Sequence, residues 1–339
     1  MNYKEIIDKD ILEIRNKINF SEMKNKKILI TGASGIVGIY LISSLRDLIT
    51  ELNLEVCAYV NNPLLENFVD IFKGVKVQQV DLSSDFSTSD KFDYIIHAAG
   101  YGQPGKFLEN KIKTIQLNTT TTIKLLSMLN TDGKFLFIST SELYSGNDSE
   151  NISEEQIGST NTDHPRSCYI EGKRCGESIC FSQNNPNIKI ARLSLAYGPG
   201  TKPDDKRVLN QLIEKALTND SINLVDSGSA MRTYCYITDA VEMFWNILLN
   251  SKSNLYNVGG FSKISILDLA KSIGVKLNKE VFFPESDELT SVGNPKLVNI
   301  SIEKYLSEFN KTEFIDLDDG LDRTILWQKQ IYNNEQNNL

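Results

Sequence analysis

A tyrosine and a lysine at helical spacing are the side chains best suited to proton transfer in this chain. Tyr169 and Lys173 lie in CYIEGKRCGE, and their separation puts both on one face of a helix. A free tyrosine, with a pKa of about 10, is a poor base at neutral pH. A neighbouring ammonium favours the tyrosinate, so the pair could take a proton from a hydroxyl group. A surface tyrosine beside a solvated lysine is the alternative interpretation.

The segment ISTSELYSG, residues 138–146, follows a predicted strand and supplies further polar side chains. Thr140 is expected to hydrogen bond a reacting hydroxyl beside Tyr169. Glu142 places a carboxylate just past the strand end, where it could transfer a second proton or bind a ligand. A glutamate that is only solvated in a loop is the alternative.

Glycines mark a cofactor loop near the N-terminus. The strand KILIT, residues 27–31, runs into TGASGIVG and then into a predicted helix over 36–49. Glycine permits a tight turn and close approach of the backbone to a pyrophosphate, and the helix N-terminus offers free N–H groups. This context predicts a dinucleotide site, whose positive nicotinamide ring would further favour the Tyr169 anion. The expected contacts are Gly32, Ser34, Gly35, Ile36, Val37 and Gly38.

Three later strand ends are expected to complete the cofactor site. The second strand ends at Asn61 or Asn62, where an acid usually holds the adenosine ribose of NAD. No lysine or arginine stands between Cys57 and Phe68 to neutralise a 2′-phosphate, which favours NAD without excluding NADP. Simple strand-end chemistry is the alternative for the remaining contacts, Asp81, Leu82, Ala98, Ala99 and Gly100.

Short apolar runs alternate with helical stretches from residue 27 to about residue 193. This alternation predicts an α/β fold, a Rossmann-type doubly wound parallel sheet with a smaller C-terminal α+β substrate domain. Strands are expected at 27–31, 54–60, 75–80, 93–99, 134–139 and 188–193, and helices at 36–49, 113–129 and 169–181.

The rhythm becomes irregular after residue 194, which predicts a second domain. A helix over 238–250 and a strand over 255–260 still look like parts of the sheet. The active site should lie in the cleft between the domains, near the carboxyl ends of the strands. The predicted parts are an N-terminal helical extension over 1–25, a dinucleotide-binding Rossmann domain over 26–193 plus 236–260, a substrate domain over 194–235 plus 261–330, and a tail over 331–339.

Composition argues against several classes of function. The 339 residues carry a net charge of -8, with a pI of about 5.1, which speaks against nucleic acid as the main partner. Two histidines and five cysteines without a CxxC pair argue against a metal centre, and reduced thiols are expected. Neither a signal peptide nor a membrane-spanning run is recognisable, so the expected location is cytoplasmic, without membrane contact.

Two arginines are candidates for binding an anionic substrate. Arg232 in SGSAMRTYCYITDA and Arg207 in DDKRVLNQ could each pair with a diphosphate through the planar guanidinium group. A surface charge without a ligand is the alternative for each.

Taken together, the motifs resemble the extended short-chain dehydrogenase/reductase family. The resemblance rests on TGASGIVG, HAAG, Thr140, the YxxxK spacing and YGPG, and it covers residue 27 to about residue 330. Members of that family modify sugars carried on nucleotide diphosphates, as epimerases, 4,6-dehydratases, decarboxylases and reductases. The resemblance implies NAD as cofactor, a nucleotide-diphosphate sugar as substrate, and a homodimer formed through a helix bundle that includes the Tyr169 helix.

Within the family, the segments STSELY, PRSCYIEGKR and RTYCYITD are most similar to UDP-glucuronate decarboxylases. The similarity implies that Thr140, Tyr169 and Lys173 oxidise the sugar at C4. It also implies that Glu142, preceded by Ser141 as a substrate contact, acts near C5. Arg232 would bind the substrate. Once C4 is a ketone, the C5 carboxylate belongs to a β-keto acid and can leave as CO2.

Other reactions of the same family remain open. A 4-epimerase needs the same Thr-Tyr-Lys set but leaves Glu142 without a chemical task. A 4,6-dehydratase, or a C4 dehydrogenase that stops at the ketone, comes next; Ser141 stands where a dehydratase normally carries Asp. Leu195, in place of an expected Asn, and the loop GYGQPGKF after HAA depart from the decarboxylase pattern. A non-enzymatic dinucleotide sensor is disfavoured because the Thr-Tyr-Lys set is complete.

Overall fold

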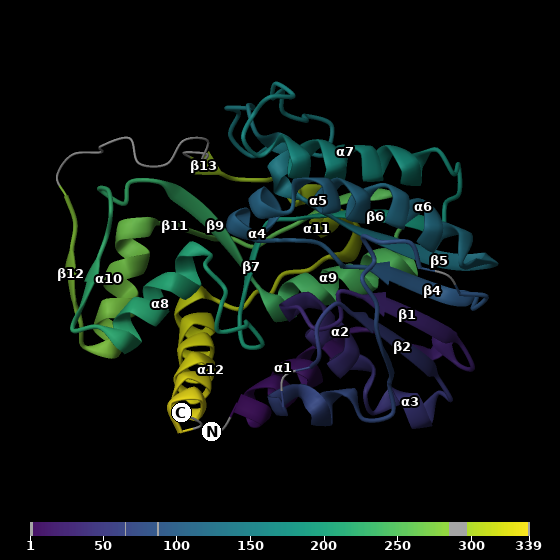
Figure 1. The fold of residues 1–339 in the computed structure, drawn as a ribbon, viewed down its shortest axis with the longest axis horizontal. Helices are drawn as coiled ribbons and strands as arrows, with labels where there is room; N and C mark the ends of the chain where they lie inside the picture. The colour runs from purple at the N-terminus through teal and green to yellow at the C-terminus, as the bar shows by residue number, and fades with distance from the viewer. Residues whose placement is uncertain (1–2, 65, 87, 285–296, 338–339) are drawn as a thin grey trace.

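A seven-stranded parallel sheet organises the N-terminal two thirds of the chain (Figure 1). Its order is β10-β6-β5-β4-β1-β2-β3, and β1 lies between β2 and β4. The chain therefore winds outward in both directions from β1, and the crevice at this reversal is where such sheets bind ligands. The predicted doubly wound parallel sheet is confirmed. Its strands are β1 (Lys27–Thr31), β2 (Glu55–Val60), β3 (Lys76–Gln79), β4 (Phe92–His97), β5 (Leu129–Thr140), β6 (Ile188–Leu193) and β10 (Leu255–Val258).

The computed structural model describes residues 3–64, 66–86, 88–284 and 297–337. The predicted extension, Rossmann domain, substrate domain and tail therefore include positions outside the described residues, namely 1–2, 65, 87, 285–296 and 338–339.

Helices cover both faces of the sheet because each turns an apolar face toward it. On one face, α9 is buried along nearly its whole length and packs with α1 and α2. On the other face, α5 and α7 lie side by side, next to α6 (Figure 1). The helices of the first face are α1 (Tyr3–Lys17), α2 (Ile36–Leu45), α3 (Leu48–Glu51) and α9 (Ile237–Asn250); those of the second are α5 (Lys111–Asn118), α6 (Thr120–Ser127) and α7 (Ser167–Phe181).

Two predicted helices are shorter than expected. The helix predicted over 113–129 breaks at Thr119 into α5 and α6, and Leu129 already belongs to β5. Threonine hydroxyls in this run bond to carbonyls four residues back, as Thr119 does to Ile115 O at 2.8 Å, and such bonds bend helices. The helix predicted over 36–49 ends at Leu45 and is followed by the separate turn α3.

The C-terminal part builds a second, smaller sheet in the order β11-β9-β13, with β7 also paired to β9. Helices and the paired strands β8 and β12 lie around it, to the left in Figure 1. These strands lie within 194–236 and 261–330, so β9 runs one residue past the predicted boundary at 235. The division into a dinucleotide-binding and a substrate domain stays a prediction. The elements are β7 (Leu195–Tyr197), α8 (Val208–Thr218), β8 (Ser221–Asn223), β9 (Met231–Tyr236), β11 (Ser262–Ser265), α10 (Ile266–Leu277), β12 (Glu280–Phe282), β13 (Leu297–Val298) and α12 (Leu317–Asn337).

Asp10 of α1 ties distant parts of the chain together. Its carboxylate is fully buried and accepts hydrogen bonds from the Tyr40 and Tyr236 hydroxyls at 2.6 and 2.7 Å. It also pairs with Arg323 of α12. The N-terminal helix therefore holds α2, β9 and α12 in one buried polar cluster.

No helix in the described ranges is long and apolar enough to cross a membrane.

Replacing Asp10 should destabilise the fold strongly. Asp10→Ala removes the buried carboxylate that pairs with Arg323 and leaves the Tyr40 and Tyr236 hydroxyls without their acceptor, so the free energy of unfolding should fall by about 3 kcal/mol. Asp8→Ala on the same helix breaks only a partly exposed pair with Arg46 and should cost less than about 1 kcal/mol. Urea denaturation of both variants measures the difference, and equal losses would contradict a special role for Asp10.

Candidate active site

A cavity of about 400 Å³ lies at the carboxyl ends of the parallel strands, where the two sheets face each other. It contains every predicted cofactor contact and most of the predicted catalytic and substrate residues. Arg232 alone of the predicted site residues does not line it. The predicted residues that do are Gly32, Ser34, Gly35, Ile36, Val37, Gly38, Asn61, Asp81, Leu82, Ala98, Ala99, Gly100, Thr140, Ser141, Glu142, Tyr169, Lys173 and Arg207.

The glycine loop after β1 leaves space that side chains would fill. Gly32 has a φ of +65°, and a Cβ there would lie 2.6 Å from Ala98 O. A Cβ on Gly38 would lie 2.5 Å from Ala33 Cα, because α2 packs directly on the loop. The loop and the first turn of α2 thus present backbone N–H groups to the cavity, as a pyrophosphate requires. The residues present fit a dinucleotide.

A buried hydrogen-bond chain fixes the end of β4 beside this loop. His97 Nε2 lies 2.9 Å from Leu117 O, an acceptor, so Nε2 must carry the proton. Nδ1 then accepts from the Thr31 hydroxyl at 2.8 Å, and the Thr31 oxygen accepts from Ala99 N–H at 3.2 Å. Burial lowers the pKa of His97 to about 3, so the ring is neutral. The histidine of HAAG therefore positions Ala99 and performs no proton transfer.

In the cavity wall just beyond β3, Asp81 is held as an anion. It accepts from the backbone N–H and the hydroxyl of Ser83 and pairs with Lys113 at 3.2 Å. The Ser83 hydrogen bonds, aided by Lys113, lower its pKa below the usual range. Asn61, whose carbonyl accepts from Gln79, lies nearby in the cavity wall.

The proton-transfer residues come from β5 and α7. Tyr169 and Lys173 lie on α7, and the Thr140 hydroxyl hydrogen bonds Tyr169 from the end of β5. Burial raises the pKa of Tyr169 to about 12, with the Thr140 hydrogen bond acting in the opposite direction. Burial lowers the pKa of Lys173 to about 8, and its Nζ donates to Ile138 O at 2.6 Å. The spacing of Tyr169 and Lys173 in the sequence correctly predicted their common face.

Phe107 on α4 (Pro104–Glu109) orients the tyrosine ring. The two rings stack at 4.8 Å with an angle of 4° between their planes. The Arg166 guanidinium lies 5.5 Å from the same Phe107 ring. The loop GYGQPGKF, which departs from the decarboxylase pattern, thus supplies a wall of the cavity next to the tyrosine.

Glu142 and Arg166 form an ion pair inside the cavity. Arg166 Nη2 lies 2.5 Å from Glu142 Oε1, and both side chains are mostly buried. Glu142 Oε2 is buried and has no hydrogen-bond partner among the described residues. Burial raises the pKa of Glu142 above its usual range, although Arg166 and Arg232 act against this shift. Glu142 is thus a carboxyl group with a raised pKa, and its Oε2 is available to bond to a ligand.

Sequence reasoning missed Arg166. Arg166 precedes Tyr169 by three residues, a spacing that brings it near the same helix face. This spacing could have identified Arg166 as a site residue. Arg232 donates to its own neighbour Met231 O at 2.8 Å and acts on Glu142 and Arg166 only through its charge. Arg207 lines the cavity but is held by Asp205, with Nη2–Oδ2 at 2.6 Å.

A side chain in place of a glycine in the loop after β1 should weaken dinucleotide binding. Gly38→Ala puts a methyl group against the backbone of the loop, so we expect weaker NAD binding and a loss of about 1–3 kcal/mol in the free energy of unfolding. Gly105→Ala is the matched control, because no atom lies within 4 Å of a Cβ there. Calorimetric titration with NAD and urea denaturation measure both effects. An unchanged affinity for Gly38→Ala would contradict the assignment of the loop.

Known proteins share both the sequence pattern and the fold. UDP-glucuronic acid decarboxylase 1 of Danio rerio is 26% identical over 328 residues, which cover 94% of this chain and 76% of that protein. UDP-glucuronic acid decarboxylase 6 of Arabidopsis thaliana is 29% identical over 268 residues, 77% of this chain and 76% of that protein.

Solved structures show the same fold. The UDP-glucuronic acid 4-epimerase of Bacillus cereus, solved with UDP-glucuronic acid and NAD, superposes with a TM-score of 0.73 at 24% identity, over 90% of this chain and 100% of that one. The epimerase Mth375 of Methanothermobacter thermautotrophicus gives a TM-score of 0.76 at 18% identity, over 97% of each chain. The model of the NAD dependent epimerase/dehydratase family matches residues 28–259, so this chain belongs to that family and its cofactor is NAD.

Proposed function

We propose that this chain oxidises a UDP-hexuronate at C4 and releases its C5 carboxyl group as CO2. The observation that carries the proposal is the Glu142–Arg166 pair, which lies in the same cavity as Thr140, Tyr169 and Lys173. Oxidation at C4 alone needs only Thr140, Tyr169 and Lys173. A further carboxyl group and a guanidinium in the same cavity suit a second reaction at the neighbouring carbon, C5. The similarity to UDP-glucuronic acid decarboxylases supports the same reaction.

The first step removes a hydride from C4 and the proton from the hydroxyl group on C4. NAD supplies the hydride acceptor and a positive charge on its nicotinamide ring. Tyr169 takes the hydroxyl proton, and Thr140 holds the reacting oxygen beside it. Lys173 lies one helical turn further along α7, where its ammonium helps to stabilise the tyrosinate. Tyr169 has a pKa of about 12 in the structure, so it needs these positive charges to act as a base at neutral pH.

The second step breaks the bond between C5 and the carboxyl carbon. The electron pair of that bond moves toward the C4 ketone, whose oxygen becomes an enolate, and CO2 leaves. The protonated Tyr169 and Thr140 can donate hydrogen bonds to this oxygen. Glu142 holds a proton more readily than an ordinary glutamate and can deliver it to C5. The product is a 4-keto-pentose, which can then be reduced at C4 or released.

Arginines account for the negative charges of the substrate in this proposal. Arg166 is the candidate for the carboxylate of the hexuronate, because its guanidinium already contacts Glu142, the residue proposed to act at C5. Arg207, held in position by Asp205, is the candidate for the diphosphate. Ser141 lies in the cavity wall between Thr140 and Glu142 and is proposed as a further substrate contact.

A C4 epimerase is the second candidate. Leu195 lines the cavity at the position where an asparagine was expected, so the sugar can be held differently from the decarboxylase pattern. An epimerase would use Thr140, Tyr169 and Lys173 in the same way and would leave the carboxyl group in place.

We also propose a homodimer and a cytoplasmic location. Ile112 of α5, Ile123 of α6 and Phe181 of α7 are 68%, 56% and 46% exposed, and together they offer an apolar surface to a second copy.

The five cysteines are free thiols, which suits a reducing compartment.

Glu142→Gln separates the two steps. The amide cannot deliver a proton to C5, so the enolate left after the first CO2 departs stays unprotonated and the site is not cleared. CO2 release from UDP-glucuronate over many turnovers should therefore fall by about 100-fold or more while NADH formation persists. Glu171→Gln is the matched control, since Glu171 pairs with Arg174 on the partly exposed side of α7. Product analysis by NMR, together with NADH absorbance, follows both steps. Undiminished CO2 release by Glu142→Gln would remove Glu142 from the mechanism.

Tyr169→Phe should abolish both steps. Without the phenol, the C4 hydroxyl proton has no acceptor, so NADH formation and CO2 release should both fall by about 100-fold or more. NAD affinity, measured by calorimetry, should change little by comparison. A variant that still forms NADH at the normal rate would exclude Tyr169 as the base.

A further inference from the structure

A lysine from the C-terminal part of the chain reaches the glycine loop of the cofactor site. Lys202 follows β7, and its Nζ lies 3.5 Å from the Ser34 hydroxyl oxygen. Both residues line the same cavity. The loop TGASGIVG itself contains no basic residue, so a cation near it must come from another segment. Lys202 is such a cation.

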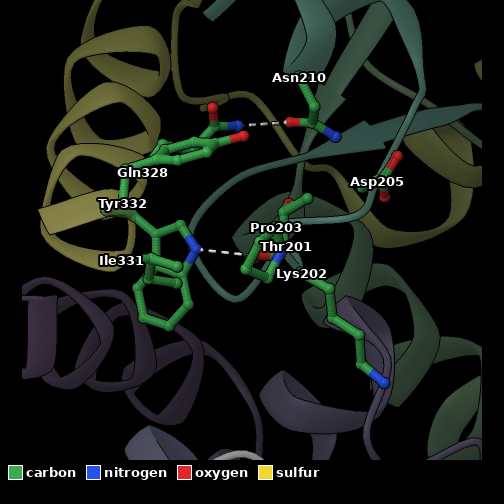
Figure 2. A pocket seen from close by; sticks show the side chains of 9 residues that line it. Thr201, Lys202, Pro203, Asp205, Asn210, Gln328, Ile331 and Tyr332 are labelled. Atoms are coloured by element: carbon green, nitrogen blue, oxygen red, sulfur yellow. Dashed lines mark hydrogen bonds between the residues drawn. The ribbon is translucent and has the colours of Figure 1, made fainter. Parts of the chain in front are cut away.

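The backbone that carries Lys202 is firmly held. Trp327 of α12 donates its indole N–H to Thr201 O at 2.9 Å, and the Thr201 hydroxyl donates to Gly198 O at 2.9 Å. On the other side, a Cβ on Gly200 would touch Tyr40 of α2, which shows how closely this segment packs against the helix that follows the glycine loop. In Figure 2 the Lys202 side chain extends away from Ile331 and Tyr332 of α12. The backbone at Lys202 is therefore held by α12 on one side and by α2 on the other.

Lys202 forms no ion pair with a carboxylate in the described part of the chain. Of the other lysines in the cavity, Lys106 pairs with Asp204 at 2.6 Å and Lys173 donates to Ile138 O. Lys202 is half-buried, and burial lowers its pKa, although Asp204 acts in the opposite direction. The Lys202 ammonium is half-buried and its hydrogen-bond partner is the neutral Ser34 hydroxyl, so a bound anion would compensate its charge.

We propose that Lys202 binds the pyrophosphate of the dinucleotide, as a charged contact contributed from outside the Rossmann part of the fold. The glycine loop and the N-terminus of α2 supply backbone N–H groups, and Lys202 supplies the positive charge that those groups lack. The diphosphate of a nucleotide sugar has the same chemistry, but the contact with Ser34 places the ammonium on the cofactor side. The inference does not depend on which sugar reaction the enzyme performs.

The arrangement couples the two ligand sites. Asp205 and Arg207, three and five residues beyond Lys202, belong to the same segment and line the same cavity, and Arg207 is the proposed contact for the substrate diphosphate. A dinucleotide bound through Lys202 would therefore fix the segment that presents Arg207.

Calorimetric titration of nucleotide-free protein tests the contact without reference to turnover. Lys202→Met should weaken binding of NAD and of ADP-ribose by about ten-fold or more, because both ligands carry the pyrophosphate. Adenosine, which lacks it, should bind both proteins equally. Lys202→Arg should retain most of the affinity. Lys206→Met, an exposed lysine in the same segment that pairs with Glu214, should match the wild type.

Three results would overturn the assignment. Equal NAD affinity in Lys202→Met and Lys206→Met would show that the ammonium does not meet the pyrophosphate. Weaker binding of UDP with unchanged binding of NAD would assign Lys202 to the diphosphate of the substrate instead. Loss of adenosine binding in Lys202→Met, retained in Lys202→Arg, would also count against it, because that pattern indicates a charge effect away from the pyrophosphate.

Discussion

The attachment of α7 to the central sheet is the interaction on which the active site depends. Gly176 lets the helix approach β5, because a Cβ there would lie 2.5 Å from the ring of Phe137. In the next position, the buried carboxylate of Glu177 pairs with Arg192 of β6 at 2.7 Å. Removing either partner of such a pair leaves a buried charge, so the helix is held firmly. This attachment sets the positions of Tyr169 and the other α7 side chains above the strand ends.

Burial then gives the site its chemical character. The same exclusion of water that raises the pKa of Tyr169 to about 12 lowers that of Lys173 to about 8 and raises that of Glu142. Each group is thereby moved toward its neutral form, and charge must be supplied by ligands or by neighbours. Arg166 already acts on Glu142 in this way, and the cofactor and substrate complete the charge balance when they bind. The cavity is thus arranged to become active only when it is filled.

Local patterns in the sequence predicted much of this arrangement. The glycine loop and the pair Tyr169 and Lys173 depend on short spacings within one strand–turn–helix or one helix, so a single segment of sequence was enough to find them. Lys202 meets Ser34 across 168 positions of sequence, and no periodicity reports such a contact. The break at Thr119 was also missed, because hydroxyl groups that bond back to the helix carbonyls are hidden in a run that otherwise looks helical.

The central claim is that the carboxyl carbon of a UDP-hexuronate leaves the sugar in this cavity. The most direct measurement uses UDP-glucuronate labelled with carbon-13 in its carboxyl group, incubated with the wild-type protein and NAD and followed by NMR. The account predicts that the label moves to bicarbonate while a UDP-pentose or UDP-4-keto-pentose accumulates. A label that stays on the hexose, with inversion at C4, would contradict decarboxylation and establish an epimerase.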